Sequence, residues 1–250
     1  MEGYRQYCAD ARGFAFGELE QGAFGDYAIW EEDFVYPIPD SIESKHAGPL
    51  MCAGASVYEA LDAANTKPSD RVGVVGIGGL GHTAVLFAKA MGCAVTAISA
   101  SASKRDDAFA LGADEFRVLS VPGESHHGPS QPSRQATGIN VLLLCTNEVP
   151  DLEPLMPLLA RRATIVPMTI QQKPMVVPFM PFILPGHRIV ASTEASRRNH
   201  IEMLRFAARH GIKPWVEEFP MTEIGVADAF HRLEEGKMRY RGVLVAEDQR

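Results

Sequence analysis

Cysteine is scarce in this sequence, and its four cysteines are far apart. Cys8, Cys52, Cys93 and Cys145 form no CxxC pair, which is typical of separate thiols in a reducing compartment rather than of a disulfide framework. The sequence also lacks an apolar run of membrane-spanning length and an apolar stretch near its N-terminus of the kind that a secretory signal contains. We therefore expect a cytoplasmic protein with no membrane partner.

Positive charge is in deficit as well. The 250 residues include 24 Lys and Arg against 31 Asp and Glu, which gives a formal net charge of -7. Non-specific nucleic-acid binding needs a basic surface that displaces counterions, so we expect no nucleic-acid partner. A hydrophobic content of 46% and a charged content of 22% are ordinary for a globular enzyme. The length allows one large domain or two small ones.

From residue 71 onward, short apolar runs alternate with amphipathic ones. The pattern predicts strands at 71–76, 94–98, 141–145, 164–168 and 188–191, and helices at 80–91, 104–111 and 154–159. Strands that alternate with helices form a parallel sheet with right-handed crossovers. We expect an α/β fold, a doubly wound parallel sheet of Rossmann type.

The flanking segments have other patterns. Residues 25–37 alternate and are expected to be β-rich, and residues 44–65 predict a helix that a turn at 67–70 closes. Residues 119–140 are polar and rich in Pro, Gly and Ser, which indicates a surface loop. The remaining elements are expected to be a helix at 200–210, a strand at 213–217, a helix at 224–235 and a strand at 241–246.

The strongest motif is the glycine-rich run Gly76-Ile77-Gly78-Gly79-Leu80-Gly81. It follows an apolar strand and opens a helix, which is the context that a dinucleotide-binding loop requires. Gly76 would permit the tight turn, Gly78 would let the backbone approach a pyrophosphate, and Gly81 would allow close packing of helix on strand. The N–H groups of the loop, Gly79 and Leu80 included, would stabilise the anion at the helix N-terminus. The alternative is a tight turn with no ligand.

The end of the second strand indicates which dinucleotide binds. NAD sites usually carry Asp or Glu there, which accepts from the ribose 2′-hydroxyl. This sequence has Ser99, Ser101, Lys104 and Arg105 instead. The hydroxyls can donate to a 2′-phosphate, and either Lys104 or Arg105 can neutralise it. The pattern favours NADP(H). The alternative, which is compatible with it, is that Ser101 or Ser103 caps the next helix.

Several segments together resemble a known family. They are GAFGDYAIW, PLMCAGASVYEAL, RVGVVGIGGLGH, ISASASKRDDAFALGADE, MLRFAARHGIKP and RYRGVLV. They are similar to the zinc-dependent medium-chain alcohol dehydrogenases, and within these to the cinnamyl alcohol dehydrogenase branch. The resemblance implies a cofactor domain at 57–195 between two pieces of a catalytic domain, 1–56 and 196–250. It also implies that Ser99, Ser101 and Lys104 meet the NADP 2′-phosphate.

The resemblance assigns further positions to the cofactor site. Ser56 takes a family threonine position near the nicotinamide, and we also expect Thr146 to contact the cofactor. Two other positions are candidates for catalysis. Tyr58 could act as a general acid or could be a packed aromatic, and Cys52 could act as a nucleophile or could be a buried small residue.

The departures from the family pattern concern zinc. The family's first zinc-binding Cys, the Ser/Thr beside it and a Gly-His-Glu motif have no counterpart here, so the catalytic domain is expected to be a reduced remnant of a GroES-like, β-rich domain. Only Cys52 matches a catalytic zinc ligand, and Cys8 matches the last cysteine of the structural zinc lobe. Because a catalytic zinc takes three protein ligands, we expect no metal site. His46 is expected to start a helix, and His82 to face cofactor or solvent.

These observations predict an NADP(H)-dependent, zinc-independent oxidoreductase. Its substrate would be a small and conjugated carbonyl compound, because such a carbonyl is already polarised without a Lewis acid. The alternative is a cyclase, an isomerase or a binding protein on a degenerate alcohol dehydrogenase fold. A third reading keeps the parent alcohol dehydrogenase activity through a metal site built from other residues. The resemblance implies a homodimer paired through the edge strand 188–191, which the apolar segment 179–186 precedes.

Overall fold

The computed structural model describes residues 3–13, 17, 19, 22, 24–25, 27–119 and 138–246. The chain divides into two compact units. Unit 1 comprises Met1–Ala55 and Glu194–Arg250, and unit 2 comprises Ser56–Thr193. The predicted loop at 119–140 falls almost entirely outside the described residues.

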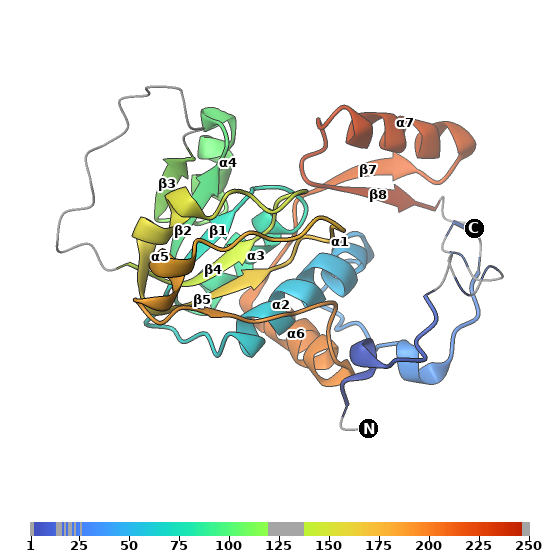
Figure 1. The fold of residues 1–250 in the computed structure, drawn as a ribbon. Coiled ribbons are helices and arrows are strands. Elements are labelled where there is room, and N and C mark those ends of the chain that lie inside the picture. The colour runs from blue at the N-terminus through green and yellow to red at the C-terminus, as the bar shows by residue number, and fades with distance from the viewer. Residues whose placement is uncertain are drawn as a thin grey trace. The chain divides into compact units, whose positions relative to one another are not determined.

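Unit 2 is built on a six-stranded, all-parallel sheet in the order β3-β2-β1-β4-β5-β6 (Figure 1). The strands are β1 (Arg71–Val75), β2 (Ala94–Ser99), β3 (Glu115–Val118), β4 (Ile139–Leu144), β5 (Leu159–Pro167) and β6 (Arg188–Ile189). The strand order reverses between β1 and β4, which is the topological switch point where doubly wound sheets bind their ligands. The expected fold class is confirmed.

The central strands are apolar because both of their faces are covered. β1 and β4 supply Val75, Leu142 and Leu144 to a buried cluster that includes Ile98 of β2 and Ile165 of β5. The helices and helical turns of the unit are α2 (Ala55–Ala63), α3 (Gly81–Ala90), η4 (Ala102–Lys104), α4 (Arg105–Ala110), η5 (Glu153–Leu158) and α5 (Phe179–Ile183). α3 packs on β1 and β2, and α4 packs on β3. This burial makes the sheet a rigid platform for the loops at its carboxyl edge.

Unit 1 contains a smaller sheet of two parallel strands, β7 (Val216–Pro220) and β8 (Arg241–Val245), joined by α7 (Glu223–Glu234). Its other elements are η1 (Arg5–Tyr7), η2 (Glu32–Phe34), α1 (Ser44–Pro49), the π-helical η3 (Leu50–Gly54) and α6 (Arg197–His210). The Ser196 side chain caps α6 by accepting from the Asn199 N–H, and Gly211 ends the helix at φ +61°. α1 and α7 both contact the two strands.

Several predicted elements need correction. Residues 27–37 contain η2 and no strand in the described part of the segment, since no neighbouring strand pairs with the alternating pattern. The strand predicted at 213–217 lies at 216–220, and the helix predicted at 154–159 is the 3-10 turn η5. The segment at 44–65 is helical to residue 63 but passes through the π turn η3. β3 and α5 were not expected.

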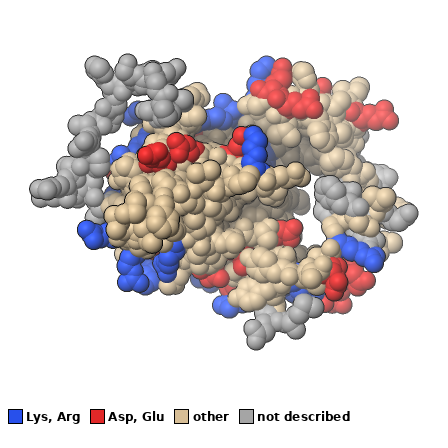
Figure 2. Space-filling view, viewed as in Figure 1, with Lys and Arg blue, Asp and Glu red and all other residues tan. Residues whose placement is uncertain are grey.

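Surface charge agrees with the composition. On the face shown in Figure 2, basic and acidic side chains form small groups among uncharged residues, several of them next to a group of opposite charge, so this face presents no continuous basic surface. Within the part of the chain that the structure describes, no helix is both long enough and apolar enough to cross a membrane.

Candidate dinucleotide-binding site

The glycine loop directly follows β1, and each of its three motif glycines meets a different spatial demand. Gly76 has φ +88°, and a Cβ atom there would lie 2.8 Å from Thr146 Cγ2. A Cβ atom at Gly81 would overlap the carbonyl oxygen of Gly76. Gly78 differs, because a Cβ atom there would meet nothing within 4 Å. Gly76 and Gly81 are therefore required by the turn itself, whereas Gly78 leaves open space beside the backbone, where a pyrophosphate would fit.

Two side chains from the first turn of α3 hold the loop in place. His82 is fully buried, and its Nδ1 donates to the carbonyl oxygen of Gly78 at 2.9 Å. Thr83 Oγ1 donates to the carbonyl oxygen of Gly79 at 3.2 Å. The expectation that His82 faces cofactor or solvent is wrong, because this hydrogen bond turns the ring into the protein. Both residues shape the loop before any ligand arrives.

Thr146 lies at the other side of the switch point, just after β4. Its Oγ1 donates to the carbonyl oxygen of Glu148 at 2.6 Å, and its own carbonyl oxygen accepts from Thr169 Oγ1 at 2.8 Å. The preceding Cys145 is buried, and burial raises the pKa of its thiol to about 12. Cys145 is therefore a packing residue. Thr146 packs so closely against Gly76 that a larger residue at position 76 would collide with its methyl group.

The serine-rich segment follows β2, the strand next to β1. The Gly76 N–H donates to the carbonyl oxygen of Ile98, so the glycine loop and this segment leave the same edge of the sheet. Ser99 is buried, Ser101 Oγ lies 2.8 Å from Ser103 Oγ, and Lys104 ends η4 with its side chain partly exposed. Ser101 occupies the N-cap of η4 but makes no side-chain capping hydrogen bond. Ser101 therefore takes the expected cap position without the capping hydrogen bond, and Ser103 does not cap α4, whose N-cap residue is Lys104.

The two candidates for catalysis lie on the helical segment that joins the units. Cys52 belongs to unit 1 and lies in the π-helical η3, where its side chain is exposed. The interpretation of Cys52 as a buried small residue is therefore wrong. Tyr58 belongs to unit 2 and packs edge-on against Phe87, with ring centroids 6.1 Å apart. This contact favours a packing role for Tyr58. Ser56 is partly buried near the start of α2.

The residues described in the structure do not fit a zinc site. No group of three His, Cys, Asp or Glu side chains among them is arranged to hold a metal ion. His46 is buried near the start of α1, as expected, and its Nδ1 donates to the carbonyl oxygen of Pro214 at 3.1 Å. The adjacent histidines His126 and His127, in the polar segment 119–140, lie outside the described residues. Sequence reasoning missed Thr83 and the structural role of His82, which both hold the glycine loop. Their only sequence signal is their place in the first helical turn after the glycine loop.

A doubly wound sheet with a glycine turn after its first strand, at the switch point, defines a dinucleotide-binding fold. Comparison with known proteins then identifies the family. Residues 79–209 match the family model described as zinc-binding dehydrogenase. The chain is 33% identical over 235 residues to NADP-dependent alcohol dehydrogenase 6 of Saccharomyces cerevisiae, a match that covers 93% of this chain and 64% of that protein.

Two further similar proteins belong to the same family. Cinnamyl alcohol dehydrogenase 8 of Arabidopsis thaliana is 34% identical over 250 residues, which covers 97% of this chain and 67% of that protein. The solved structure of a cinnamyl alcohol dehydrogenase from Sorghum bicolor superposes with a TM-score of 0.75 at 35% identity, covering 85% of this chain and 58% of that one. The chain belongs to the medium-chain alcohol dehydrogenase family, in its cinnamyl alcohol dehydrogenase-like branch, and it spans about two thirds of the length of these curated relatives.

Proposed function

We propose that the chain is an NADP(H)-dependent oxidoreductase. Two features at one sheet edge carry the proposal. The first is the glycine loop with open space at Gly78, and the second is the end of β2 at Ser99, which Ser101 and Lys104 follow with no acid between them. An acid at Ser99 would repel a 2′-phosphate, whereas hydroxyls and an ammonium group bind it. The NADP dependence of the yeast relative supports the same assignment.

Each part of the site has a role toward the dinucleotide. The N–H groups of Gly78, Gly79 and Leu80, at the N-terminus of α3, would hold the pyrophosphate. Ser99, Ser101 and Lys104 would hold the 2′-phosphate, and Ser56 and Thr146 would flank the nicotinamide half. When bound, the cofactor supplies the hydride.

The substrate that suits this chain is a conjugated carbonyl compound. Zinc in an alcohol dehydrogenase polarises the carbonyl, and no group of three His, Cys, Asp or Glu side chains among the described residues is arranged to hold such an ion. A conjugated carbonyl needs less polarisation, because hydride addition at carbon yields a delocalised enolate. We propose that unit 1, with its two short strands, is the remnant of the catalytic domain and that unit 2 is the cofactor domain.

A homodimer through the β6 edge is the assembly that we propose. Both residues of β6, Arg188 and Ile189, are exposed, and β5 occupies only one side of the strand. The neighbouring α5 exposes Phe179, and Leu184 after it is 74% exposed. A second copy that paired along β6 would satisfy the open backbone groups and cover this apolar surface.

The test is consumption of NADPH with an α,β-unsaturated ketone and, in parallel, with a saturated aldehyde of the same length. We expect turnover of the ketone, little turnover of the aldehyde, and no change when a chelator is added. Metal analysis of the purified protein is expected to find well below one zinc per chain. Stoichiometric zinc together with chelator-sensitive aldehyde reduction would contradict zinc independence. Saturable NADPH binding without turnover of either compound would favour the cyclase, isomerase or binding-protein alternative.

The proton donor is tested separately. Cys52→Ser and Tyr58→Phe each remove one candidate and conserve the shape of the side chain. We expect Tyr58→Phe to leave turnover unchanged, because the ring packs on Phe87 in either form. A large fall in kcat for Tyr58→Phe, with KM for NADPH unchanged, would instead assign the proton to Tyr58.

A further inference from the structure

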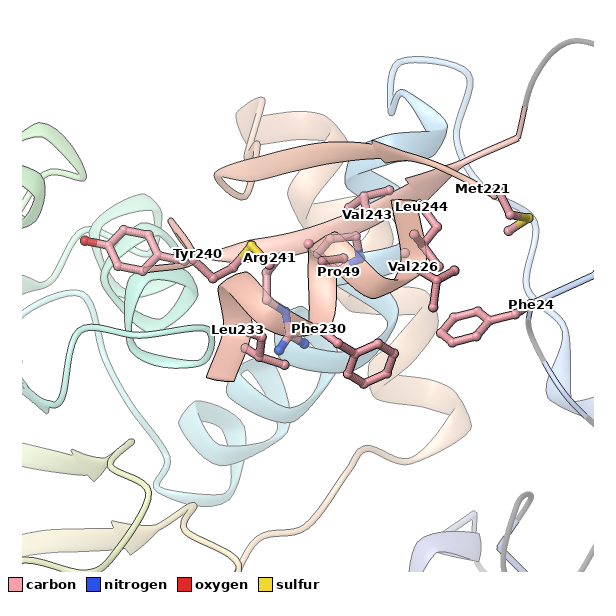
Figure 3. A pocket seen from close by; sticks show the side chains of 14 residues that line it. Phe24, Pro49, Met221, Val226, Phe230, Leu233, Tyr240, Arg241, Val243 and Leu244 are labelled. Atoms are coloured by element: carbon pink, nitrogen blue, oxygen red, sulfur yellow. The ribbon is translucent and has the colours of Figure 1, made fainter. Parts of the chain in front are cut away.

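Unit 1 contains an apolar cavity of about 420 Å³ that is lined by residues of this unit alone. Its walls come from α7, from β8 and from the end of α1 (Figure 3). Val226, Phe230 and Leu233 lie on the α7 side, and Val243 and Leu244 on the β8 side. This volume falls in the range of small-molecule pockets, roughly 300–1,000 Å³.

One charged residue interrupts this apolar lining. Arg241 is the only charged residue among those that line the cavity, and in Figure 3 its side chain extends toward Phe230 and Leu233. Over the described residues, no carboxylate lies within ion-pair distance of its guanidinium group. Arg232, also on α7, pairs with Glu217. The described residues therefore supply no carboxylate to the Arg241 guanidinium group, which could pair with an anionic ligand.

A guanidinium group beside apolar side chains is stabilised when a carboxylate binds it through two parallel hydrogen bonds. The surrounding side chains favour an apolar body on the same ligand. Phe230 and Leu233 are 51% and 57% exposed, so such a body would cover side chains that are now open to water. We propose that this cavity binds an amphipathic carboxylate, an alkyl chain with one anionic head, and that Arg241 holds the head.

This proposal does not depend on the dinucleotide site, which belongs to unit 2. The probes are decanoate, decanol and decylamine, which share one alkyl chain and differ in the charge of the head. Binding is measured by calorimetry on the full chain without NADPH, below the micelle concentration. Trp215 provides a second readout, because its ring stacks on Tyr240, a lining residue, at a centroid distance of 5.9 Å. We expect saturable binding of decanoate, weaker binding of decanol and none of decylamine.

Three variants distinguish the contribution of the Arg241 charge to binding from the contribution of the apolar cavity. Arg241→Gln is expected to weaken decanoate binding about 10- to 100-fold and to leave decanol binding unchanged. Arg241→Lys keeps the charge and is expected to keep most of the affinity. Ala229→Phe fills the cavity and is expected to reduce binding of both ligands. The matched control is Arg209→Gln, which removes an exposed positive charge from α6 outside the cavity lining.

Three results would overturn the proposal. The first is no saturable binding of decanoate. The second is an equal effect of Arg241→Gln and Arg209→Gln on decanoate affinity, which would reduce the role of Arg241 to overall charge. The third is decanol binding as tight as decanoate binding in the unmodified chain, which would leave the guanidinium group without a role. If Arg241→Gln does not fold, the comparison of Arg241→Lys and Ala229→Phe, with the three probes, decides the outcome.

Discussion

The two sheets that the structure describes differ in how many of their strand residues are buried. In unit 2, four of the five residues of β1 and five of the six residues of β4 are buried. In unit 1, neither β7 nor β8 has a single buried residue. A two-stranded sheet is marginal in water without a partner that covers it. The difference indicates that the sheet of unit 2 has a fully buried interior, whereas the strands of unit 1 leave part of their apolar side chains exposed to water.

The largest effect is expected at the glycine loop of the platform. Gly81→Ala forces a methyl group into the carbonyl oxygen of Gly76, and we expect a loss of about 4 kcal/mol or more in the free energy of unfolding. The matched control is Gly78→Ala, where the new methyl group meets open space and stability should change by less than about 0.5 kcal/mol. Urea unfolding followed by circular dichroism measures both.

The same pair of variants tests the ligand assignment. Gly78→Ala is expected to weaken NADPH binding strongly although the fold is intact, because the methyl group occupies the proposed pyrophosphate position. Unchanged NADPH affinity in a folded Gly78→Ala protein would mean that the loop is a tight turn with no ligand.

A leucine truncation compares the two sheets directly. Leu142 of β4 is fully buried, so Leu142→Ala is expected to cost about 3 kcal/mol of unfolding free energy. Leu244 of β8 is only partly buried, so Leu244→Ala should cost about 1 kcal/mol or less. The free energy of unfolding of each variant is measured by urea denaturation and compared with that of the unmodified chain. Equal losses would show that the small sheet is as tightly packed as the large one, and the contrast between the units would fail.

The choice of cofactor gives a smaller effect. Lys104→Glu replaces a cation by an anion at the proposed 2′-phosphate position, so NADPH affinity should fall about 10- to 100-fold while NADH affinity changes about twofold or less. The comparison is Arg105→Glu, the alternative cation, whose guanidinium group lies over the ring of Phe109; a larger loss of NADPH affinity in Arg105→Glu would assign the 2′-phosphate to Arg105 instead. If Lys104→Glu lowered the affinities for NADPH and NADH equally, Lys104 could not be assigned to the 2′-phosphate.

The smallest effect concerns pH. His187 lies next to β6 in a buried position, its Nδ1 has no hydrogen-bond partner in the described chain, and burial lowers the pKa of the imidazole below its ordinary 6.5. The folded state therefore prefers neutral His187. Its contribution to stability is complete above that ordinary pKa and is lost as the pH falls through 6.5 toward the folded-state value.

We expect the free energy of unfolding to fall as the pH is lowered through 6.5, because the unfolded state then binds a proton at His187 that the folded state does not yet bind. His187→Gln should flatten that part of the pH profile, measured by urea unfolding at each pH. A profile of unchanged slope in the variant would assign the pH dependence to other groups.

The parts that the sequence predicts well are those with local signals. β1, the glycine loop and α3 follow from an apolar strand, a glycine pattern and a small-residue helix that are contiguous in the chain. β3 was missed because Glu115–Val118 is short, charged and only partly buried, so it lacks the apolar run of an inner strand. The strand expected within 25–37 failed for the opposite reason, because alternation alone cannot supply a neighbouring strand.

The remaining errors involve contacts between distant residues or local helix geometry. The inward orientation of His82 comes with a hydrogen bond of its side chain to the Gly78 carbonyl oxygen four residues earlier, which the hydrophobic pattern of the sequence does not report. The exposure of Cys52 follows from the π turn at Leu50–Gly54, where an extra residue per turn changes the direction of the side chains. Arg241 has no motif at all, and only the cavity around it distinguishes it from other surface arginines.

The central claim is that the platform binds NADP(H) through the glycine loop and the serine-rich end of β2. The most direct test is a fluorescence titration of the unmodified chain with NADPH and, in parallel, with NADH. The account predicts saturable binding of NADPH, with NADH bound at least about tenfold more weakly because it lacks the 2′-phosphate. Equal affinities would contradict the choice of cofactor, and no saturable binding of either would contradict the dinucleotide site itself.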